Sequence, residues 1–371
     1  MIAAEAQRVL GARPDSVVRL THSRVTRGVW RVAAGEDTAV VKVLAVPASP
    51  SEAAGDSMRY WRREDRIYSA GMTAAYRDAG VRGPRLLARV DRPNGDIALW
   101  LEDVAGAPAS SWDLPAFARA VRRLGRAQGT YSAGAPLPSD DWLSRGFIRQ
   151  YLAARKPEDE ALLMSDDEWR RPIIARHFSR DLRDELRRLR TDRDRLLGWL
   201  EAAPPTLAHL DVWPDNMFEV GDELVLIDWG FAGIGSAGED PGNLVPDSVF
   251  DLRHPASILT ELDRTVFDAY LAGMRDAGWD GDERRVRLAM TACVCKYDWI
   301  AGATLARAAT ETPTQPIYGD EEVEAEVLVA SRAAVLSFLV ERAAEARNLA
   351  GKLESVSTKR VSTRDGTGGQ R

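Results

Sequence analysis

Short apolar runs alternate with turn-forming residues over the first hundred positions. Valine-rich runs are typical of strands, and the Gly, Asp and Pro residues between them are typical of tight turns. We therefore expect five short strands, over residues 16–20, 28–33, 38–44, 86–90 and 97–101. Apolar residues at helical spacing predict one main helix over residues 57–79 and a short amphipathic helix over residues 2–10.

From Trp112 onward, apolar residues recur at the three- and four-residue spacing of helices. The predicted helices cover residues 114–131, 142–155, 169–201 and, in several pieces, 255–350. One insert, residues 204–231, instead predicts two short strands around a polar loop. The charged run 180–195 mixes Arg with Asp and Glu, so we interpret it as a solvated helix face with i,i+4 ion pairs rather than a binding patch.

These patterns predict an α+β chain in two lobes. Residues 1–101 form a small antiparallel β-rich lobe with one main helix, and residues 112–350 form a larger, mostly helical lobe. Residues 102–111 connect the two. The polar tail, residues 351–371, is expected to be disordered. A cleft between two such lobes is a usual place for a small ligand.

Composition narrows the class of protein. The 371 residues carry a net charge of −6, from 50 basic and 56 acidic residues, and 45% are hydrophobic. These are ordinary values for a globular protein, and net acidity argues against a nucleic-acid partner. No apolar run has the length of a signal peptide or a membrane span, so we expect a cytoplasmic protein with no membrane partner. Cys293 and Cys295 are expected to be buried thiols.

The polar loop of the insert carries an ordered set of reactive residue types. His209, Asp211 and Asn216 follow the first apolar strand as H-x-D-x-x-x-x-N, and Asp228 begins D-x-G after the second strand. This spacing resembles the catalytic and metal-binding loops of the protein kinase superfamily. Asn216 and Asp228 offer the oxygen ligands that Mg²⁺ prefers. Asp211 is the predicted catalytic group that accepts or orients a hydroxyl proton, and His209 is predicted to brace the catalytic loop.

Residues of the β-rich lobe would complete such a site. Lys42 lies inside the predicted strand 38–44 and is the only Lys in the first 155 residues, where Arg takes every other basic position. A compact ammonium suits a position beside the α- and β-phosphates of a nucleotide better than the wide guanidinium of Arg. Glu64, on the following helix, is the predicted ion-pair partner of Lys42. Arg27 and Gly28, between the first two strands, would cover the phosphates, although a full Gly-rich motif is missing.

The connector between the lobes offers backbone groups for a purine. In this architecture the carbonyl of Glu102 and the amide of Val104 are predicted to bind the edge of adenine. Because backbone atoms would make these contacts, the side chains do not distinguish a purine site from a plain linker.

Taken together, the motifs are similar to those of the aminoglycoside phosphotransferase and choline kinase-like family, over roughly residues 20–270. The most specific stretch runs from His209 to Gly230. Leu210 stands where the family commonly has Gly, and Trp229 stands where protein kinases have Phe. The resemblance implies a bilobal protein kinase-like fold. It also implies an enzyme that uses ATP and Mg²⁺ to phosphorylate a hydroxyl group of a small molecule, with GTP left open as the donor.

The acceptor site is the least determined part of the prediction. The resemblance implies that Asp240 braces the catalytic loop and that the acceptor pocket is built by the helical lobe. The candidate acceptor contacts are Trp213, Asp247, Asp251, Tyr297, Asp298 and Trp299. Acidic residues would suit a cationic aminoglycoside, and tryptophans would stack on a sugar or a base. A sugar, a nucleoside and an amino alcohol all stay open as acceptors.

Two other functions fit part of the pattern. A non-catalytic nucleotide-binding regulator of the same fold would bind ATP and Mg²⁺ without transfer to any acceptor. A protein kinase would need a peptide-docking segment of the Ala-Pro-Glu type after Asp228, and the sequence continues without one. The oligomeric state is not predicted.

Overall fold

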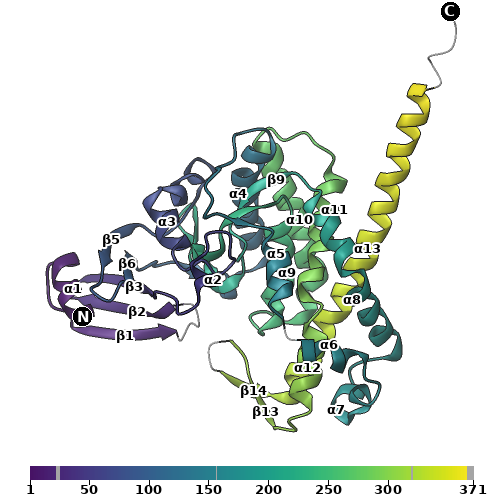
Figure 1. Cartoon of the computed structure of the whole chain (residues 1–371), viewed down its shortest axis with the longest axis horizontal. Coiled ribbons are helices and arrows are strands. Elements are labelled where there is room, and N and C mark those ends of the chain that lie inside the picture. The colour runs from purple at the N-terminus through teal and green to yellow at the C-terminus, as the bar shows by residue number, and fades with distance from the viewer. Residues whose placement is uncertain (22–25, 156, 319–320, 366–371) are drawn as a thin grey trace, which may run out of the picture. The chain divides into compact units, whose positions relative to one another are not determined.

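The computed structural model describes residues 1–21, 26–155, 157–318 and 321–365, and its contacts divide the chain into two compact units (Figure 1). Unit 1 comprises Met1–Gln150, Thr206–Gly235 and Ala272–Trp279. Unit 2 comprises Tyr151–Pro205, Ser236–Leu271 and Asp280–Arg371. This division differs from the predicted lobes. Most of the insert 204–231 and the helix Leu114–Ser132 belong to unit 1, together with the β-rich region.

A five-stranded antiparallel sheet, in the order β1-β2-β3-β6-β5, forms the N-terminal part of unit 1 (Figure 1). Its strands are β1 (Ser16–Thr21), β2 (Thr26–Ala34), β3 (Asp37–Leu44), β5 (Leu86–Asp91) and β6 (Ile97–Glu102). All five predicted strands are confirmed, with ends that move by at most two residues. The predicted N-terminal helix is also present as α1 (Ile2–Val9).

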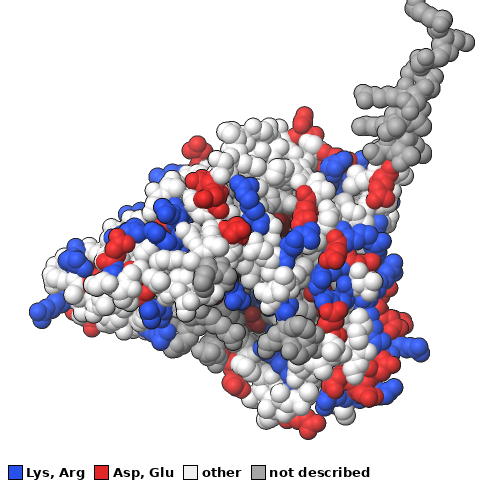
Figure 2. All heavy atoms as spheres, viewed as in Figure 1, with Lys and Arg blue, Asp and Glu red and all other residues white. Residues whose placement is uncertain are grey.

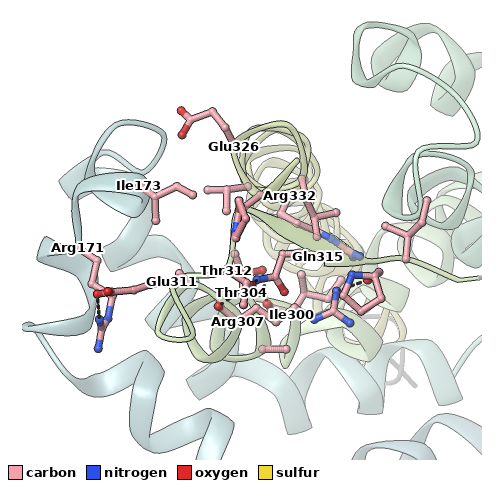
Figure 3. Close-up of a pocket in the computed structure, with 18 of the residues that line it drawn as sticks. Arg171, Ile173, Ile300, Thr304, Arg307, Glu311, Thr312, Gln315, Glu326 and Arg332 are labelled. Carbon is pink, nitrogen blue, oxygen red and sulfur yellow. Dashed lines mark hydrogen bonds and ion pairs between the residues drawn. The ribbon is translucent and has the colours of Figure 1, made fainter. Parts of the chain in front are cut away.

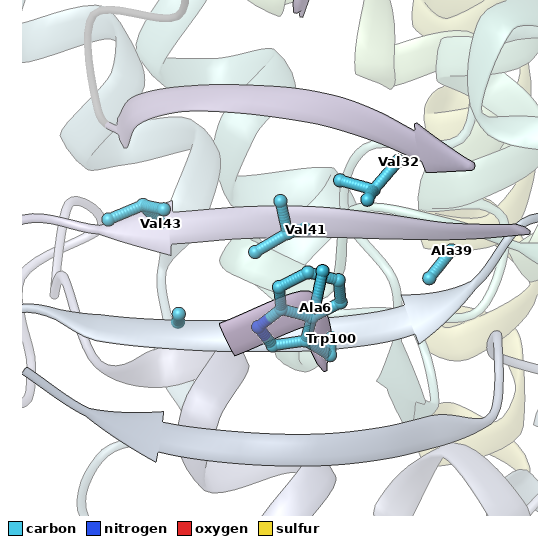
Figure 4. Close-up of a cluster of buried hydrophobic side chains, with 7 residues drawn as sticks. Ala6, Val32, Ala39, Val41, Val43 and Trp100 are labelled. Atoms are coloured by element: carbon cyan, nitrogen blue, oxygen red, sulfur yellow. The ribbon is translucent and has the colours of Figure 1, made fainter. Parts of the chain in front are cut away.

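The two faces of this sheet bury different clusters of side chains. Val41 and Val43 of β3 pack with Trp100 and with Ala6 of α1 on one face (Figure 4). Leu44 packs with Tyr68 in a second cluster. Because side chains alternate between faces along a strand, Lys42 lies on the face of Leu44, opposite the valines. The alternation therefore turns the one Lys of this sheet away from α1.

The predicted helix over residues 57–79 is wrong in its length. The structure has a two-turn helix, α3 (Arg63–Ser69), followed by 3-10 turns at Met72–Ala74 and Arg77–Ala79. Gly71 ends α3 with a φ of +67°, a left-handed conformation that glycine adopts without a Cβ penalty. Residues before α3 curl around the side chain of Arg63 instead of forming helical hydrogen bonds.

Strand pairing ties the catalytic insert to the rest of unit 1. The insert contains β9 (Pro205–Ala208), the polar loop, and the hairpin of β10 (Met217–Val220) and β11 (Glu223–Leu226). The two predicted strands correspond to β9 and β11, and β10 is a third strand that was not predicted. β11 pairs with β4 (Val81–Arg82), and β10 pairs with β7 (Ala107–Pro108). The predicted lobe boundaries at 101 and 112 therefore do not separate these elements.

Further elements of the two units are mostly helical. The remaining bounds are α2 (Pro50–Ala53), α4 (Leu114–Ser132), β8 (Ser144–Arg145), α5 (Phe147–Ala153), α6 (Pro157–Met164), α7 (Pro172–Ala175), α8 (Arg180–Glu201), β12 (Gly233–Ser236), α9 (Glu239–Phe250), α10 (Leu259–Asp276), α11 (Glu283–Ala292), α12 (Ile300–Ala308), β13 (Thr314–Pro316), β14 (Glu322–Glu324) and α13 (Ala325–Asp365). Helix α4 confirms the predicted helix over residues 114–131. Its start is set by Asp113, whose side chain accepts a hydrogen bond from the Ala116 amide at 2.9 Å.

Helices α8, α11 and α13 pack against one another at the centre of unit 2. Arg347 of α13 pairs with Glu185 at 3.1 Å and with Asp192 at 3.0 Å, both on α8. Within α8, Arg188 lies 3.8 Å from Asp192, an i,i+4 pair of the predicted kind. Figure 2 shows basic and acidic side chains interspersed around α8 rather than gathered by sign.

Two predicted helices of the second half are interrupted. The run 169–201 divides into a 3-10 turn, α7 and α8, because Pro172 starts a new helix and Ser179 caps α8 by accepting a hydrogen bond from the Leu182 amide. Only α5 is α-helical in the run 142–155, after β8 and Gly146, whose φ is +62°.

The expectation of a disordered tail from residue 351 is wrong for residues 351–365, which continue α13 (Figure 1). Gly351 is a single weak helix former, and the Lys, Leu and Glu residues that follow it are strong ones. No proline interrupts the run. The cost of one glycine, about 1 kcal/mol, does not end a helix that is already propagating. Residues 366–371 lie outside the described residues.

Cys293 and Cys295 are free and fully buried, as predicted, and burial raises the pKa of both thiols. None of the described helices combines the length and the apolar character that crossing a bilayer requires.

Glu239, in the first turn of α9, makes the stability of unit 2 depend on pH. Its side chain is 5% exposed, and one carboxyl oxygen accepts a hydrogen bond from the Ser236 amide at 3.0 Å. Burial, with a smaller contribution from the charge of Asp240, raises the pKa of Glu239 from 4.5 to about 7, although the hydrogen bond from Ser236 opposes the shift. Between these pH values the folded protein keeps a proton that the unfolded chain has lost, so the free energy of unfolding falls as pH rises.

We predict that Glu239→Gln removes this loss, because a neutral amide can still accept the Ser236 hydrogen bond. The difference in free energy of unfolding, variant minus wild type, should therefore increase by about 3 kcal/mol between pH 5 and pH 8. Urea unfolding at the two pH values measures the difference. An identical pH dependence of the two proteins would show that Glu239 is ionised in the folded state.

Candidate active site

The ammonium of Lys42 joins three elements of unit 1. Its Nζ lies 2.5 Å from an Oε of Glu64 on α3 and 2.7 Å from Oδ1 of Asp228, which follows β11. Lys42 is 7% exposed and Glu64 is 2% exposed, so solvent screens their pair weakly. The predicted partner of Lys42 is therefore in contact with it, and the predicted metal ligand Asp228 binds the same ammonium.

Electrostatics favour the charged forms of Lys42 and Asp228. Burial alone would lower the pKa of Lys42, but the Asp228 and Glu64 carboxylates more than offset burial and raise it. Burial opposes ionisation of Asp228 as well, but the charge and the hydrogen bond of Lys42 hold the pKa of Asp228 below its usual value. Burial and the charge of Asp228 raise the pKa of Glu64. The side chain of Asp228 stays 46% exposed, which leaves its carboxylate accessible to a ligand.

His209 is buried and braces the loop that it begins. Its Nε2 lies 3.0 Å from the carbonyl oxygen of Ile227, and since a carbonyl can only accept, Nε2 is the protonated nitrogen. The ring packs edge-on against Trp229, with centroids 4.7 Å apart. These contacts link the loop after β9 to the loop after β11, which agrees with the predicted bracing role.

The backbone at Leu210 accounts for the family's preference for glycine at this position. Leu210 has a φ of +66°, a conformation that costs a residue with a side chain about 1–2 kcal/mol and costs glycine almost nothing. Its side chain is completely buried. Packing of an apolar side chain offsets the backbone strain here.

Asp211 and Asn216 lie in direct contact. The Nδ2 group of Asn216 donates to the backbone oxygen of Asp211 at 3.0 Å and to its Oδ2 at 2.9 Å. Asn216 is 6% exposed, and this pairing uses its amide nitrogen. The side-chain oxygen of Asn216, Oδ1, is therefore the atom left to bind a cation or to accept a hydrogen bond.

The sequence prediction missed Arg63, which fixes the loop after Asp228. Arg63 is completely buried and donates hydrogen bonds to five backbone carbonyls, including that of Gly230 at 3.1 Å. The other acceptors are Gly55, Ser57, Met58 and Trp142. Its neighbour Glu64 drew attention as an ion-pair partner, whereas nothing in an Arg-rich sequence marks Arg63 as buried.

Gly28 and Arg27 do not form the predicted turn between the first two strands. Both lie inside β2, where Gly28 has a φ of +146° and a Cβ at that position would meet the ring of Trp30 at 2.8 Å. Arg27 pairs with Asp96 at 2.5 Å. Residues 22–25, which connect β1 and β2, lie outside the described residues, and a phosphate-covering role of Arg27 and Gly28 stays a prediction.

The predicted purine-binding connector is anchored by charge. Glu102 ends β6, its amide donates to the Arg85 carbonyl at 2.9 Å, and its carboxylate pairs with Arg82 at 2.8 Å. Hydrogen bonds from Arg82 hold the pKa of Glu102 below its usual value although burial opposes this. Val104 follows outside any strand and is half-buried. The Glu102 side chain is thus structural, and the backbone role predicted for both residues stays a prediction.

The predicted acceptor contacts are divided between the two units. Trp213 lies on the catalytic loop of unit 1 and is half-buried. In unit 2, Tyr297 donates to Asp247 at 2.8 Å, and Lys296 lies 3.5 Å from the same carboxylate. Tyr297 and Lys296 thus both bind the carboxylate of Asp247, whose side chain is 21% exposed.

Asp298 is a structural residue rather than an acceptor contact. Its side chain is 1% exposed and pairs with Arg190 of α8 at 2.6 Å, an ion pair that a solvent-borne substrate could not reach. Asp251 and Trp299, in contrast, both line a cavity of unit 2. Asp240, predicted to be structural, is fully buried in the first turn of α9.

The chain matches the sequence profile of a known family. The profile of the phosphotransferase enzyme family, APH, covers residues 18–286. Among curated proteins, none matches the chain in sequence.

Solved structures share the fold at low sequence identity. An aminoglycoside phosphotransferase from Alicyclobacillus acidocaldarius superposes with a TM-score of 0.53 at 15% identity, covering 94% of this chain and 96% of that one. A microcompartment-associated aminopropanol kinase gives 0.52 at 17% identity, covering 93% and 98%. The amicoumacin kinase hAmiN, solved with AMP-PNP, Ca²⁺ and Ami, gives 0.51 at 13% identity, covering 89% and 93%. These likenesses establish the kinase-like fold predicted from the motifs.

Replacing Arg63 should destabilise unit 1. We expect Arg63→Met to lower the free energy of unfolding by about 3 kcal/mol or more, because buried carbonyls lose their donors. The neighbouring Arg62→Met is the matched control, since Arg62 is only partly buried and pairs with Asp65 at 3.3 Å, and its loss should cost about 1 kcal/mol or less. Denaturant unfolding measures both. Equal costs would show that Arg63 does not organise the loop.

Proposed function

The chain belongs to the phosphotransferase enzyme family, and we propose that it transfers the γ-phosphoryl group of ATP to a hydroxyl group of a small molecule in a Mg²⁺-dependent reaction. The observation that carries this proposal is the contact of Lys42 with both Glu64 and Asp228. A buried ammonium held in place by one carboxylate and adjacent to a second, half-exposed one is suited to bind nucleotide phosphates beside a metal ion.

Each residue of the site has a defined part in this reaction. Asp211 accepts the proton of the acceptor hydroxyl while that oxygen attacks the γ-phosphorus. The bond from the γ-phosphorus to the β,γ-bridging oxygen breaks, and ADP leaves with the bonding electron pair. The hydrogen bond from Asn216 fixes the orientation of the Asp211 carboxylate. Lys42 neutralises charge on the phosphates throughout.

The side chains present fit Mg²⁺. Asn216 and Asp228 would hold the ion through a carbonyl and a carboxylate oxygen, the donors that Mg²⁺ prefers. No group of three or more His, Cys, Asp and Glu side chains gathers as a metal site anywhere in the described part of the chain, so phosphate oxygens and water would complete the coordination. When bound, the ion supplies charge neutralisation at the transferring phosphoryl group. The hAmiN structure, which contains an ATP analogue together with a divalent cation, supports the same pairing of ligands here.

Small hydroxylated molecules are the acceptors we propose. Related folds include enzymes named for amicoumacin, aminopropanol and aminoglycosides, so the fold serves acceptors of different size and charge. We propose an antibiotic, a sugar, a nucleoside or an amino alcohol as the acceptor class.

Removing the base should abolish transfer without abolishing nucleotide binding. We expect Asp211→Asn to lower kcat by about 10²–10⁴-fold, because the hydroxyl proton loses its acceptor, while the Kd of ATP·Mg²⁺ changes little. Asp215→Asn, in the same loop, is the matched control and should keep most of the activity. Comparable turnover by Asp211→Asn and wild type would refute the assignment of the base.

A mass-spectrometric screen tests the reaction itself. Wild type and Asp211→Asn each meet ATP, Mg²⁺ and a pool of aminoglycosides, macrolides, nucleosides, amino sugars and amino alcohols. A product heavier by one phosphoryl group, formed by wild type alone, identifies the acceptor class. ATP·Mg²⁺ binding without transfer to any acceptor would favour a regulator, and phosphorylation of a generic protein instead would favour a protein kinase.

A further inference from the structure

Unit 2 contains a cavity of about 740 Å³, a volume typical of small-molecule sites. It is lined by residues of α7, the end of α9, α12, β13 and the first turns of α13 (Figure 3). All the lining residues belong to unit 2, so the cavity does not depend on how the two units are arranged. Much of its wall is apolar and includes Ile300, Ile317 and Leu328.

Positive charge exceeds negative charge in this wall. Four arginines and three carboxylates line the cavity. Arg171 lies 3.8 Å from Glu311, and Arg176 pairs with Glu326. Of the two remaining arginines, Arg332 pairs with Asp251 at 3.1 Å, whereas Arg307 donates to the Pro316 carbonyl at 2.9 Å and acts on Asp251 through its charge alone.

Arg332 lies almost completely inside the protein. It is 5% exposed, and its Nη2 donates to Oδ1 of Asp251 at 3.1 Å. Its Nη1 is buried and has no hydrogen-bond partner among the described residues. Burial lowers the pKa of Arg332 to about 9, and the charge of Arg307 adds to this shift, whereas the carboxylates of Asp251 and Asp247 oppose it. Asp247 is itself bound by Lys296 and Tyr297, so Asp251 is the carboxylate that Arg332 contacts.

A second donor in the same wall is also unsatisfied. The indole Nε1 of Trp299 is buried and makes no hydrogen bond to any described residue. Buried donors without acceptors are rare and costly, about 1–3 kcal/mol each. Arg332 and Trp299 both need an acceptor, and neither guanidinium nor indole nitrogen can itself accept.

We propose that this cavity binds an organic anion, a molecule with an apolar body and a carboxylate or phosphate group whose oxygens accept hydrogen bonds from Arg332 and Trp299 and face Arg307. The apolar wall holds the body of the ligand, and the excess of guanidinium charge in this wall holds its anionic group. A polycation is excluded from this cavity, because it would meet Arg307 and Arg332. The acidic residues that suggested a cationic aminoglycoside do not act as a cation site here, since Asp251 is already bound to Arg332.

Four ligands with the same apolar body and different charge test the proposal on the full chain. They are naphthoate, naphthyl phosphate, neutral naphthamide and naphthylmethylammonium, titrated by calorimetry without nucleotide. We expect the two anions to bind at least about tenfold more tightly than the amide, a difference of about 1.4 kcal/mol, and the ammonium to bind most weakly. Equal affinity for all four, tighter binding of the ammonium, or no binding of either anion in the millimolar range would overturn the proposal.

Substitutions of residues that line the cavity test whether the anions bind there. Arg307→Met, at an exposed position, should weaken binding of the anions about tenfold and leave that of naphthamide unchanged. Asp251→Asn should tighten binding of the anions, because Arg332 loses its competing carboxylate. Arg195→Met, on α8 away from the cavity, is the control and should change neither. Unchanged anion affinity in both Arg307→Met and Asp251→Asn would overturn the site, and these two variants keep the test valid if Arg332→Met does not fold.

A final experiment distinguishes two roles of the cavity, as the pocket for the phosphoryl acceptor or as a site for a separate ligand. Hydroxynaphthoate is incubated with ATP, Mg²⁺ and wild type or Arg307→Met. Phosphorylation with a KM raised in the variant identifies the cavity as the acceptor pocket, whereas anion binding without phosphorylation identifies a separate ligand. Anion binding by Asp211→Asn, which needs no catalysis, distinguishes failure of this site from failure of the proposed function.

Discussion

The organisation of unit 1 depends on the ion pairs that the ammonium of Lys42 forms with Glu64 and Asp228. The ammonium joins β3 and α3 to the loop after β11, although Asp228 in that loop lies 186 residues further along the chain than Lys42. A buried charge is costly unless it is paired, so these three elements are constrained to keep their positions. Arg63 adds a second constraint, since it ties the start of α3 to Gly230 beyond Asp228.

The catalytic loop is shaped by similar local constraints. The Nε2 proton of His209 binds the carbonyl of Ile227, and the amide of Asn216 binds Asp211, so the loop is fixed at both ends. These hydrogen bonds leave the side-chain oxygen of Asn216 and the half-exposed carboxylate of Asp228 as groups that a ligand can contact. The residues proposed to react are thus held by residues that do not react.

Unit 2 differs from unit 1 in what its charges do. Several of its ion pairs tie separate elements together, as between Arg347 of α13 and Glu185 of α8 or between Arg190 of α8 and Asp298, and they serve packing. The cavity near Arg332 is different, because arginines outnumber carboxylates in its wall and an indole donor has no acceptor among the described residues.

The sequence predicted the parts of the molecule that have a period or a motif. The strands of the first sheet follow from alternating valines, and Lys42 and Glu64 follow from the chemistry that the loop residues require. Long-range packing was not predictable in the same way. The helix over residues 57–79 breaks because carbonyls before α3 bind Arg63, and Asp298 is a structural ion pair because Arg190 approaches it from α8. Neither partner is marked by spacing along the chain.

The nucleotide-binding role of Lys42 is tested by a calorimetric titration of AMP-PNP and Mg²⁺ into wild type and Lys42→Met. If Lys42 holds the nucleotide phosphates, wild type binds and the variant binds at least about tenfold more weakly, a loss of about 1.4 kcal/mol or more. Circular dichroism of the variant shows whether it stays folded. Equal affinity of the two folded proteins for AMP-PNP would contradict this role, because the cluster around Lys42 would then be a structural ion pair and not a nucleotide site.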